Sequence, residues 1–350
     1  MDRVFHKNGY DVVVSEPTMY VDNQSRGRSG HMSHALAEFA PNKFIDFNSN
    51  CSMNRHGGHS TFGWIEYRIS EDGGETYGDI KTLPYSYESF IEGLQMISVE
   101  KAVACDDGTI VAFCLRNDPV SICQPWETPT VILSTDGGER WSKPYEMCQY
   151  KGRVYDAVYH NGVIYALEYC NAGEGHFCGE KPEHLYRIFI SEDNGRSFRE
   201  LCVVPIDYLG RSYGALLFDD EGKLHVYGYN LHDERNIDHA VSLDCGKTWK
   251  KTETCYLAKG IRNIQVAQMD GIYIMHGRAE QQTGFVLYTS KDGYTWDEGE
   301  LLAEVKQYCY YSNNLVLKDK DGSNRLLVQY SESYGGSRVN VFHLWVKIKK

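Results

Sequence analysis

The stretch SEDGGETY at residues 70–77 is the first of five near copies of one phrase, and the others read STDGGERW (134–141), SEDNGRSF (191–198), SLDCGKTW (242–249) and TSKDGYTW (289–296). Successive copies lie about 50 to 65 residues apart, which is the period of a repeated supersecondary unit. Because a unit of that size cannot bury its apolar face alone, each unit has to pack against its neighbours. The period of the phrase therefore decides the architecture.

Between the phrases the chain alternates apolar segments with turns rich in Asp, Asn and Gly. Segments such as AVACDDGTIVAFCLR (102–116) and AVYHNGVIYALEYC (157–170) read as a strand, a turn and a second strand, which is a hairpin signature. A third strand leads into each phrase and a fourth follows it. Each period thus predicts a four-stranded antiparallel sheet, the blade of a propeller. One weak helix is expected, at 87–95, in a connection.

The number of hairpins predicts six blades. Their first strands begin near Ala35, Ala102, Ala157, Ala215, Val266 and Leu315. The last blade lacks the phrase and ends the chain, and YDVVVS (10–15) can supply its missing outer strand. Joining both termini in one blade removes exposed sheet edges. We therefore expect an all-β fold, a six-bladed β-propeller closed by the N-terminal strand, with residues 1–350 as a single domain.

The repeated phrase itself reads as a structural turn. Its Asp can accept backbone N–H bonds, its Gly supplies a conformation that other residues resist, and its final aromatic residue fills a gap between strands. The fifth copy departs from this pattern, since Lys291 stands where Asp is expected and Asp292 follows one place later. No catalytic role is expected for the phrase.

Composition excludes several classes of partner. A net charge of −12 argues against nucleic acid, and the chain has no run of eighteen apolar residues that could cross a membrane. The 11 cysteines form neither a CxxC pair nor a zinc-like set, so we expect no metal and no cofactor. Scattered cysteines and an N-terminus without a signal peptide favour the cytoplasm, or secretion if a signal was removed. The oligomeric state is left open.

The phrase Ser-x-Asp-x-Gly-x-x-Trp resembles the Asp box of sialidases and sialidase-like proteins, which are six-bladed β-propellers. Its five copies extend over most of the chain. The same phrase also occurs in propellers that are not sialidases, so a function has to be inferred from the site.

Aligning the six inner strands places one residue of each strand at a common level. Four positions before the strand reference points stand His31, Ser98, Arg153, Arg211, Arg262 and Tyr311. Arginine suits bidentate binding of a carboxylate. The resemblance implies that an arginine triad holds the carboxylate of the sugar and that a tyrosine attacks its anomeric carbon. For each arginine alone, a salt bridge at the rim is the alternative.

Two further segments match sialidases. YCYYSNNLVLKDKDGSNRLLVQY (308–330) resembles the nucleophile segment, in which Tyr311 matches the nucleophile. The spacing from Tyr311 to Leu315 is one residue longer than expected, so Tyr310 is an alternative. VAQMDGIYIMHGR (266–278) resembles the hairpin that ends in a triad arginine, which adds Arg278 to the candidates for substrate binding.

The chain also departs from the sialidase pattern. It has no Phe-Arg-Ile-Pro stretch near its N-terminus, and Asn263 stands where a glutamate should activate the tyrosine, which is a weak nucleophile without a base. GRSGHMSHA (27–35) and NRHGGHS (54–60) instead gather histidines around the first hairpin. These are His31, His34, His56 and His59. Imidazoles suit general acid–base catalysis, and their spacing does not match a helical zinc motif.

Other inner-strand residues offer acidic and basic groups. Glu100, Lys101 and Asp156 occupy neighbouring positions, and Asp156 follows Arg153 closely in GRVYDA. Asp156 is the preferred catalytic carboxylate, with a simple salt bridge as its alternative.

Three functions remain. The first is an exo-acting glycoside hydrolase of sialidase-like type that cleaves a terminal acidic sugar, with carbohydrate as its partner. The second is a polysaccharide lyase or atypical glycosidase that uses His and Tyr on a uronic acid. The third is a glycan-binding propeller without catalysis.

Overall fold

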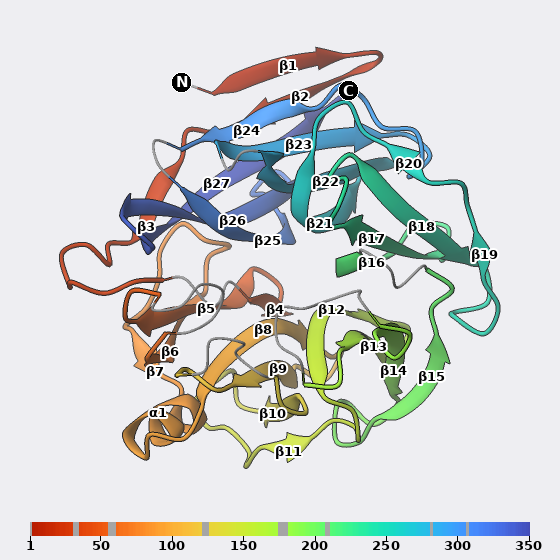
Figure 1. Ribbon diagram of the computed structural model, residues 1–350. Coiled ribbons are helices and arrows are strands. Elements are labelled where there is room, and N and C mark those ends of the chain that lie inside the picture. The colour runs from red at the N-terminus through yellow and green to blue at the C-terminus, as the bar shows by residue number, and fades with distance from the viewer. Residues whose placement is uncertain are drawn as a thin grey trace.

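The computed structural model of the chain describes residues 2–30, 35–54, 61–120, 126–173, 181–206, 211–280, 283–305 and 308–350, with only the backbone described at positions 211 and 212. Six antiparallel sheets stand around a common centre (Figure 1). The prediction of an all-β, six-bladed propeller is confirmed.

The six blades follow the order of the chain. Blade 1 consists of β4 (Leu36–Ala40), β5 (Lys43–Cys51), β6 (Gly63–Ser70) and β7 (Lys81–Thr82). Blade 2 consists of β8 (Met96–Ala104), β9 (Ile110–Asn117), β10 (Thr130–Ser134) and β11 (Tyr145–Glu146). Blade 3 consists of β12 (Gly152–His160), β13 (Val163–Cys170), β14 (Leu185–Ser191) and β15 (Arg199–Val203). Blade 4 consists of β16 (Arg211–Phe218), β17 (Leu224–Asn230), β18 (Asn236–Ser242), β19 (Lys250–Lys251) and β20 (Cys255–Tyr256). Blade 5 consists of β21 (Ile261–Met269), β22 (Ile272–Ala279), β23 (Gly284–Ser290) and β24 (Glu300–Glu304).

Blade 6 contains both ends of the chain. Its strands are β25 (Cys309–Lys318), β26 (Asn324–Gly335), β27 (Arg338–Lys349), β1 (Arg3–Lys7), β2 (Tyr10–Val14) and β3 (Thr18–Val21). β2 pairs with β27 in antiparallel register from Asp11 opposite Lys349 to Val14 opposite Val346. The N-terminal strand therefore closes the ring, as the sequence predicts.

The hairpin of β1 and β2 also connects blade 6 to blade 5. Arg3 Nη1 donates to the Leu301 carbonyl at 2.7 Å, and Lys7 Nζ donates to Glu300 Oε1 at 2.7 Å. Both partners lie on β24, the outer strand of blade 5. The first residues of the chain thus hold two blades together.

The first four copies of the repeated phrase fold into the same turn. In the first copy, Ser70 Oγ donates to Asp72 Oδ1 at 3.0 Å and accepts the Gly74 N–H at 2.8 Å. Asp72 also accepts the Thr76 hydroxyl and backbone N–H, and these bonds lower the pKa of its carboxyl to about 2. The phrase is therefore a structural turn, in which the Asp carboxylate accepts hydrogen bonds from the turn itself and so holds its backbone in place.

The interpretation of the fifth copy was wrong by one residue. Ser290 is its true serine, because Ser290 Oγ donates to Asp292 Oδ1 at 2.9 Å, two positions on, as in every other copy. The Gly293 N–H then reaches Ser290 Oγ at 3.0 Å, three positions on instead of four. The Asp is in place, and one residue between Asp and Gly is missing.

The aromatic residue of the phrase fills the gap between two blades. Trp141 of blade 2 packs on Phe47 of blade 1 with ring centroids 5.7 Å apart, and its Nε1 donates to the Tyr67 hydroxyl at 3.2 Å. Tyr67 donates in turn to the Gly138 carbonyl at 2.7 Å. In the same way, Tyr227 of blade 4 donates to the Gly293 carbonyl of blade 5. Each phrase therefore fastens its blade to the preceding one.

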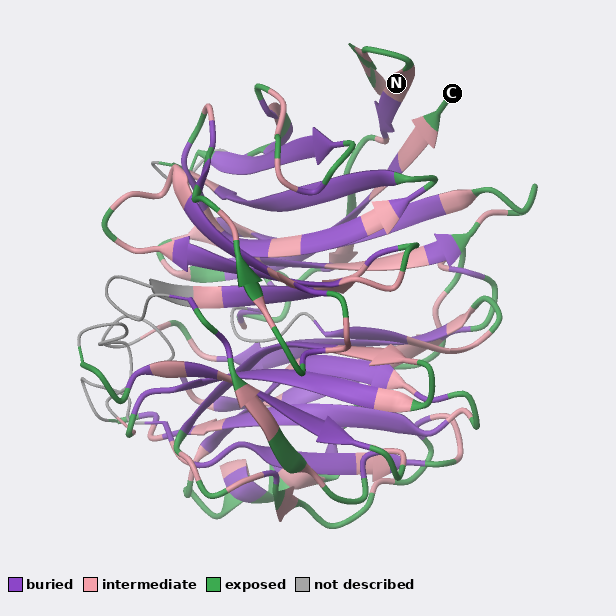
Figure 2. Ribbon diagram, turned by 90° about the vertical axis from the view of Figure 1, so that its right-hand side faces the viewer, coloured by how far each residue is buried: buried purple, intermediate pink, exposed green. Residues whose placement is uncertain are grey.

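Burial follows this arrangement. The strands are mostly buried along their length, while the loops at both ends of the blades are exposed (Figure 2). One helix, α1 (Pro84–Ile91), lies in the connection from blade 1 to blade 2 and starts three residues earlier than predicted, with proline in its first turn. Among the described helices, none is long and apolar enough to span a membrane.

Candidate functional site

Five of the six inner strands carry a β-bulge at nearly the same level. The register shifts between Val99 and Lys101, Val154 and Asp156, Ser212 and Gly214, Arg262 and Gln265, and Cys309 and Ser312. A bulge leaves one residue unpaired and turns its side chain out of the regular alternation. The bulged segments contain Glu100, Tyr155, Tyr213, Asn263 and Tyr311, and all of these line one pocket.

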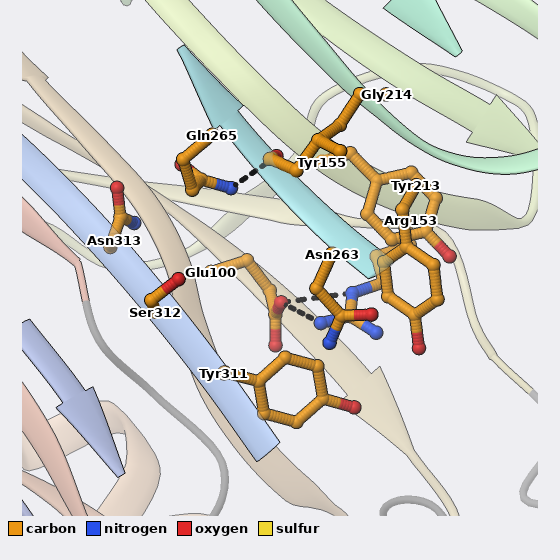
Figure 3. Close-up of a pocket in the computed structure, with 11 residues that line it drawn as sticks. Glu100, Arg153, Tyr155, Tyr213, Gly214, Asn263, Gln265, Tyr311, Ser312 and Asn313 are labelled. Atoms are coloured by element: carbon orange, nitrogen blue, oxygen red, sulfur yellow. Dashed lines mark hydrogen bonds and ion pairs between the residues drawn. The ribbon is translucent and has the colours of Figure 1, made fainter. Parts of the chain in front are cut away.

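The pocket lies where blades 2 to 6 meet (Figure 3). It is lined by Glu100, Arg153, Tyr155, Tyr213, Gly214, Asn263, Ile264, Gln265, Tyr311, Ser312 and Asn313. Its cavity volume of about 40 Å³ leaves room for a few water molecules. A larger ligand has to open this pocket or to enter it with only one of its groups.

A buried ion pair forms one wall of the pocket. Arg153 Nε donates to Glu100 Oε2 at 2.8 Å, and Arg153 Nη2 donates to the same oxygen (Figure 3). Arg153 is 3% exposed. Burial acts to lower the pKa of Arg153, but the Glu100 carboxylate and the neighbouring tyrosines together outweigh it and raise the pKa. Arg153 was predicted to hold a substrate, and the structure pairs it with Glu100.

Aromatic rings surround the Arg153 guanidinium. Its carbon lies 4.9 Å from the ring centroid of Tyr155, 5.5 Å from that of Tyr311 and 5.6 Å from that of Tyr213. Cation–π contacts of this length stabilise an arginine that has lost its water. The rings thus fix the ion pair, and they also bring the Tyr311 side chain into the pocket.

Tyr311 is half-buried beside a second tyrosine. Its ring centroid lies 6.5 Å from that of Tyr213. Burial and the Tyr213 phenol raise the pKa of Tyr311, and the Arg153 cation only partly opposes them. In this arrangement the Tyr311 phenol keeps its proton. Tyr310 lies nearby, with its carbonyl accepting Asn263 Nδ2 at 3.2 Å.

Two pocket residues have a left-handed backbone. Tyr213 has φ of 48° and Asn263 has φ of 54°. Asn tolerates this region, whereas a bulky aromatic residue adopts it rarely and at a cost. Such strain concentrates at sites where side chains must be aimed, and here both residues point into the pocket.

Two further arginines lie beside the pocket, on the paired strands β21 and β22. Arg262 stands opposite Arg278 in the register. Arg262 Nε lies 3.0 Å from Glu234 Oε1, and Arg278 Nη1 donates to the Cys309 carbonyl at 3.3 Å. The structure therefore brings these two predicted ligands together, at a place distinct from Arg153.

Asp156 and Lys101 lie deeper along the central channel. Lys101 Nζ is 2.9 Å from Asp156 Oδ1, and Lys101 also donates to Gln265 and Asn313. Asp156 accepts the backbone N–H groups of Ala157 and Leu216. Neither lines the pocket at Tyr311, and both line the cavity further along the inner strands. Their predicted roles stay predictions.

Some of the predicted residues cannot be placed. His31, His34, His56 and His59 lie outside the described residues, and so does the side chain of Arg211. Ser98 is buried. Tyr155 and Tyr213 were not predicted from the sequence as site residues, although both stand two positions before their strand reference points. An aromatic residue at this position in two successive inner strands was the available signal, and the bulges turn both toward the pocket.

Solved structures share this fold at low identity. A protein of unknown function from Dyadobacter fermentans matches with a TM-score of 0.73 and 14% identity, covering 97% of this chain and 99% of that chain. A Hadza microbial sialidase matches with a TM-score of 0.67 and 13% identity, covering 95% and 68%. The Trypanosoma rangeli sialidase in complex with 2,3-difluorosialic acid matches with a TM-score of 0.64 and 12% identity, covering 99% and 59%.

Neither a protein-family model nor a curated protein matches the chain. The chain therefore has the six-bladed fold that sialidases also have, and at these identities the likeness concerns the fold alone.

Proposed function

We propose that the protein is an exo-acting glycoside hydrolase of sialidase-like type that cleaves a terminal acidic sugar from a glycan. The observation that carries this proposal is the convergence of Tyr311, Glu100 and Arg153 from three blades on one pocket. Sialidases with the same fold support the choice of substrate class. Tyrosine is the nucleophile of such enzymes, which are exceptions among glycosidases.

In this proposal each residue has a defined part. The Tyr311 oxygen bonds to the anomeric carbon as the glycosidic bond breaks, and the phenol passes its proton to the Glu100 carboxylate. Glu100 passes this proton to the departing glycosidic oxygen. Water then attacks the anomeric carbon, the bond to the Tyr311 oxygen breaks, and the proton released by the water returns to Tyr311. Glu100 is the carboxylate within the pocket, in place of the glutamate that Asn263 replaces. Arg262 and Arg278 hold the carboxylate of the sugar.

A second function, glycan binding without catalysis, is favoured by one observation. The pKa of Tyr311 is raised, and the first causes are burial and the neighbouring Tyr213 phenol. A tyrosine that keeps its proton is a poor nucleophile. The lyase alternative depends on the histidines and stays a prediction.

A fluorogenic sialoside tests the proposal. We expect the wild-type protein to release the fluorophore and Tyr311→Phe to lose at least about 100-fold in rate, which is typical for removal of a catalytic group. Tyr310→Phe is the matched control and should retain its rate. Uronic-acid oligosaccharides, followed by the absorbance of an unsaturated product, test for a lyase. Binding of sialosides without turnover of any substrate would favour the second function.

A further inference from the structure

Two buried acceptor atoms of the pocket have no hydrogen-bond partner among the described residues. They are Glu100 Oε1 and Asn263 Oδ1. The Glu100 side chain is 8% exposed, and Asn263 is 4% exposed. Buried polar atoms are rarely left unpaired in native proteins, and an exception at a pocket points to a missing ligand or water. The pocket therefore presents two hydrogen-bond acceptors that a ligand with donor groups can satisfy.

The surroundings of Glu100 explain why one of its oxygens is left over. The bonds from Arg153 Nε and Nη2 both end on Oε2. The pair is electrically neutral, so the pocket carries no spare positive charge from Arg153. The side-chain oxygens of Gln265 and Asn313, which also line the pocket, already accept from Lys101. The cation in the pocket, Arg153, and the cation in the neighbouring cavity, Lys101, are thus each paired with a carboxylate of the protein.

Because these two acceptors lack donors, they determine which group of a ligand can bind in the pocket. A carboxylate has acceptors only, so at this place it would face Glu100 Oε1 and Asn263 Oδ1 without a donor between them. Sugar hydroxyls can donate to both atoms. A hydroxyl-bearing edge of a sugar is therefore complementary to the pocket, and a carboxylate is not.

A donor without a partner lies outside the pocket. Arg278 Nε is buried and has no hydrogen-bond partner among the described residues, and Arg278 is 8% exposed. Arg278 donates to the carbonyl of Cys309, and Asn263 donates to that of Tyr310, the next residue. Arg278 on β22 and Asn263 on β21 thus contact consecutive residues of β25.

We propose that the sugar binds with its hydroxyl edge on Glu100 Oε1 and Asn263 Oδ1 and with its carboxylate outside the pocket at Arg278. Arg153 is then a positioning residue for Glu100 and does not touch the carboxylate. This orientation rests on the proposed function for its acidic sugar, and it makes the acceptor pair and Arg278 separate determinants of specificity.

Calorimetric titration with a matched pair of ligands tests this orientation. The ligands are the methyl glycoside of N-acetylneuraminic acid and its methyl ester, which differ in the carboxylate alone. The variants are Asn263→Asp, Asn263→Ala and Arg278→Gln. Asp tolerates the left-handed backbone at 263 but loses the hydrogen bond from Asn263 to the Tyr310 carbonyl, so the stability of this variant is measured as well. Gln268→Glu is the matched control, because it adds the same charge on the same strand but lines the lower cavity.

We expect Asn263→Asp to change the affinity for the acid and the affinity for the ester by factors that agree within about threefold, because a carboxylate also accepts from hydroxyls. Asn263→Ala should weaken both ligands by the same factor, about five- to tenfold, through the loss of one acceptor. Arg278→Gln should remove the preference for the acid and leave the ester unchanged. Gln268→Glu should change neither affinity, and thermal melting verifies that every variant is folded.

The opposite results separate two failures. If Asn263→Asp loses the acid by about thirtyfold or more and keeps the ester, the carboxylate lies in the pocket and the orientation is overturned, while the proposed function stands. A wild-type protein that binds the ester better than the acid supports the hydroxyl edge but overturns the acidic substrate. Binding of neither ligand by the wild-type protein overturns both proposals.

Discussion

At the scale of single residues, the ion pair of Glu100 and Arg153 determines the character of the pocket. Both groups are buried and their opposite charges neutralise each other, so the pair does not behave as a free cation. A buried charge pair contributes little net stability compared with an apolar pair of the same size, but a single buried charge is very unfavourable. This asymmetry gives a direct test of the pairing.

Arg153→Met should be strongly destabilising, and a second change should reverse part of the loss. Removing the guanidinium leaves the Glu100 carboxylate buried and unpaired, which costs about 3 to 5 kcal/mol. Adding Glu100→Gln removes that charge, so the double variant should be more stable than Arg153→Met alone. Urea unfolding of the wild type, both single variants and the double variant measures this coupling. Additive losses would show that the two groups do not depend on each other.

At the scale of elements, the inner strands explain what the sequence could and could not predict. The repeated phrase and the hairpins predict the blades well, because turns and alternation are local. Counting four positions back from each strand selects Arg153 and Tyr311, both of which line the pocket. It misses Tyr155 and Tyr213, because a bulge in each strand interrupts the alternation. The pairing of Arg153 with Glu100 joins two blades, and no local pattern encodes such a contact.

The turn of the phrase also gives a prediction at this scale. Tyr67 accepts from Trp141 Nε1 and donates to the Gly138 carbonyl, which lie in the next blade. Tyr67→Phe leaves these groups unpaired and should cost about 1 to 3 kcal/mol in the free energy of unfolding. Tyr227→Phe removes the equivalent bond to Gly293 and should cost a similar amount. Tyr256→Phe, at a 64% exposed position, is the control and should be neutral.

At the scale of the whole molecule, ring closure depends on the strand β2. Val12 and Val14 of this strand are fully buried in the apolar core of blades 5 and 6. Val12→Ala should lower the free energy of unfolding by about 2 kcal/mol, because it leaves a cavity at the closure. Val4→Ala on β1, where the side chain is 46% exposed, should have little effect. If the two changes had equal effects on the free energy of unfolding in urea, closure of the ring would not depend on the buried contacts of β2.

The pH dependence of stability is set by buried groups in different blades. Burial raises the pKa of Glu168 to about 8, although the Cys148 thiol opposes the shift. Burial, together with the neighbouring His225, lowers the pKa of His239 to about 3. In unfolded chains these groups have pKa values of about 4.3 and 6.5. Glu168 therefore stabilises the fold at low pH and loses that contribution as the pH rises toward 8. His239 stabilises the fold above pH 6.5 and loses its contribution as the pH falls toward 3.

Two variants separate these opposite effects in the range where both groups titrate. Between pH 4.5 and 6.5, the difference in unfolding free energy between the wild type and His239→Gln should increase with pH. The corresponding difference for Glu168→Gln should decrease with pH over the same range. Each slope is limited to about 1.4 kcal/mol per pH unit, the value of one proton. Gln24→Asn, at an exposed position without a titratable group, is the control and should give a flat difference. Urea titrations at four pH values measure all three, and two slopes of the same sign would contradict the assignment of Glu168 and His239 as buried groups with opposite shifts.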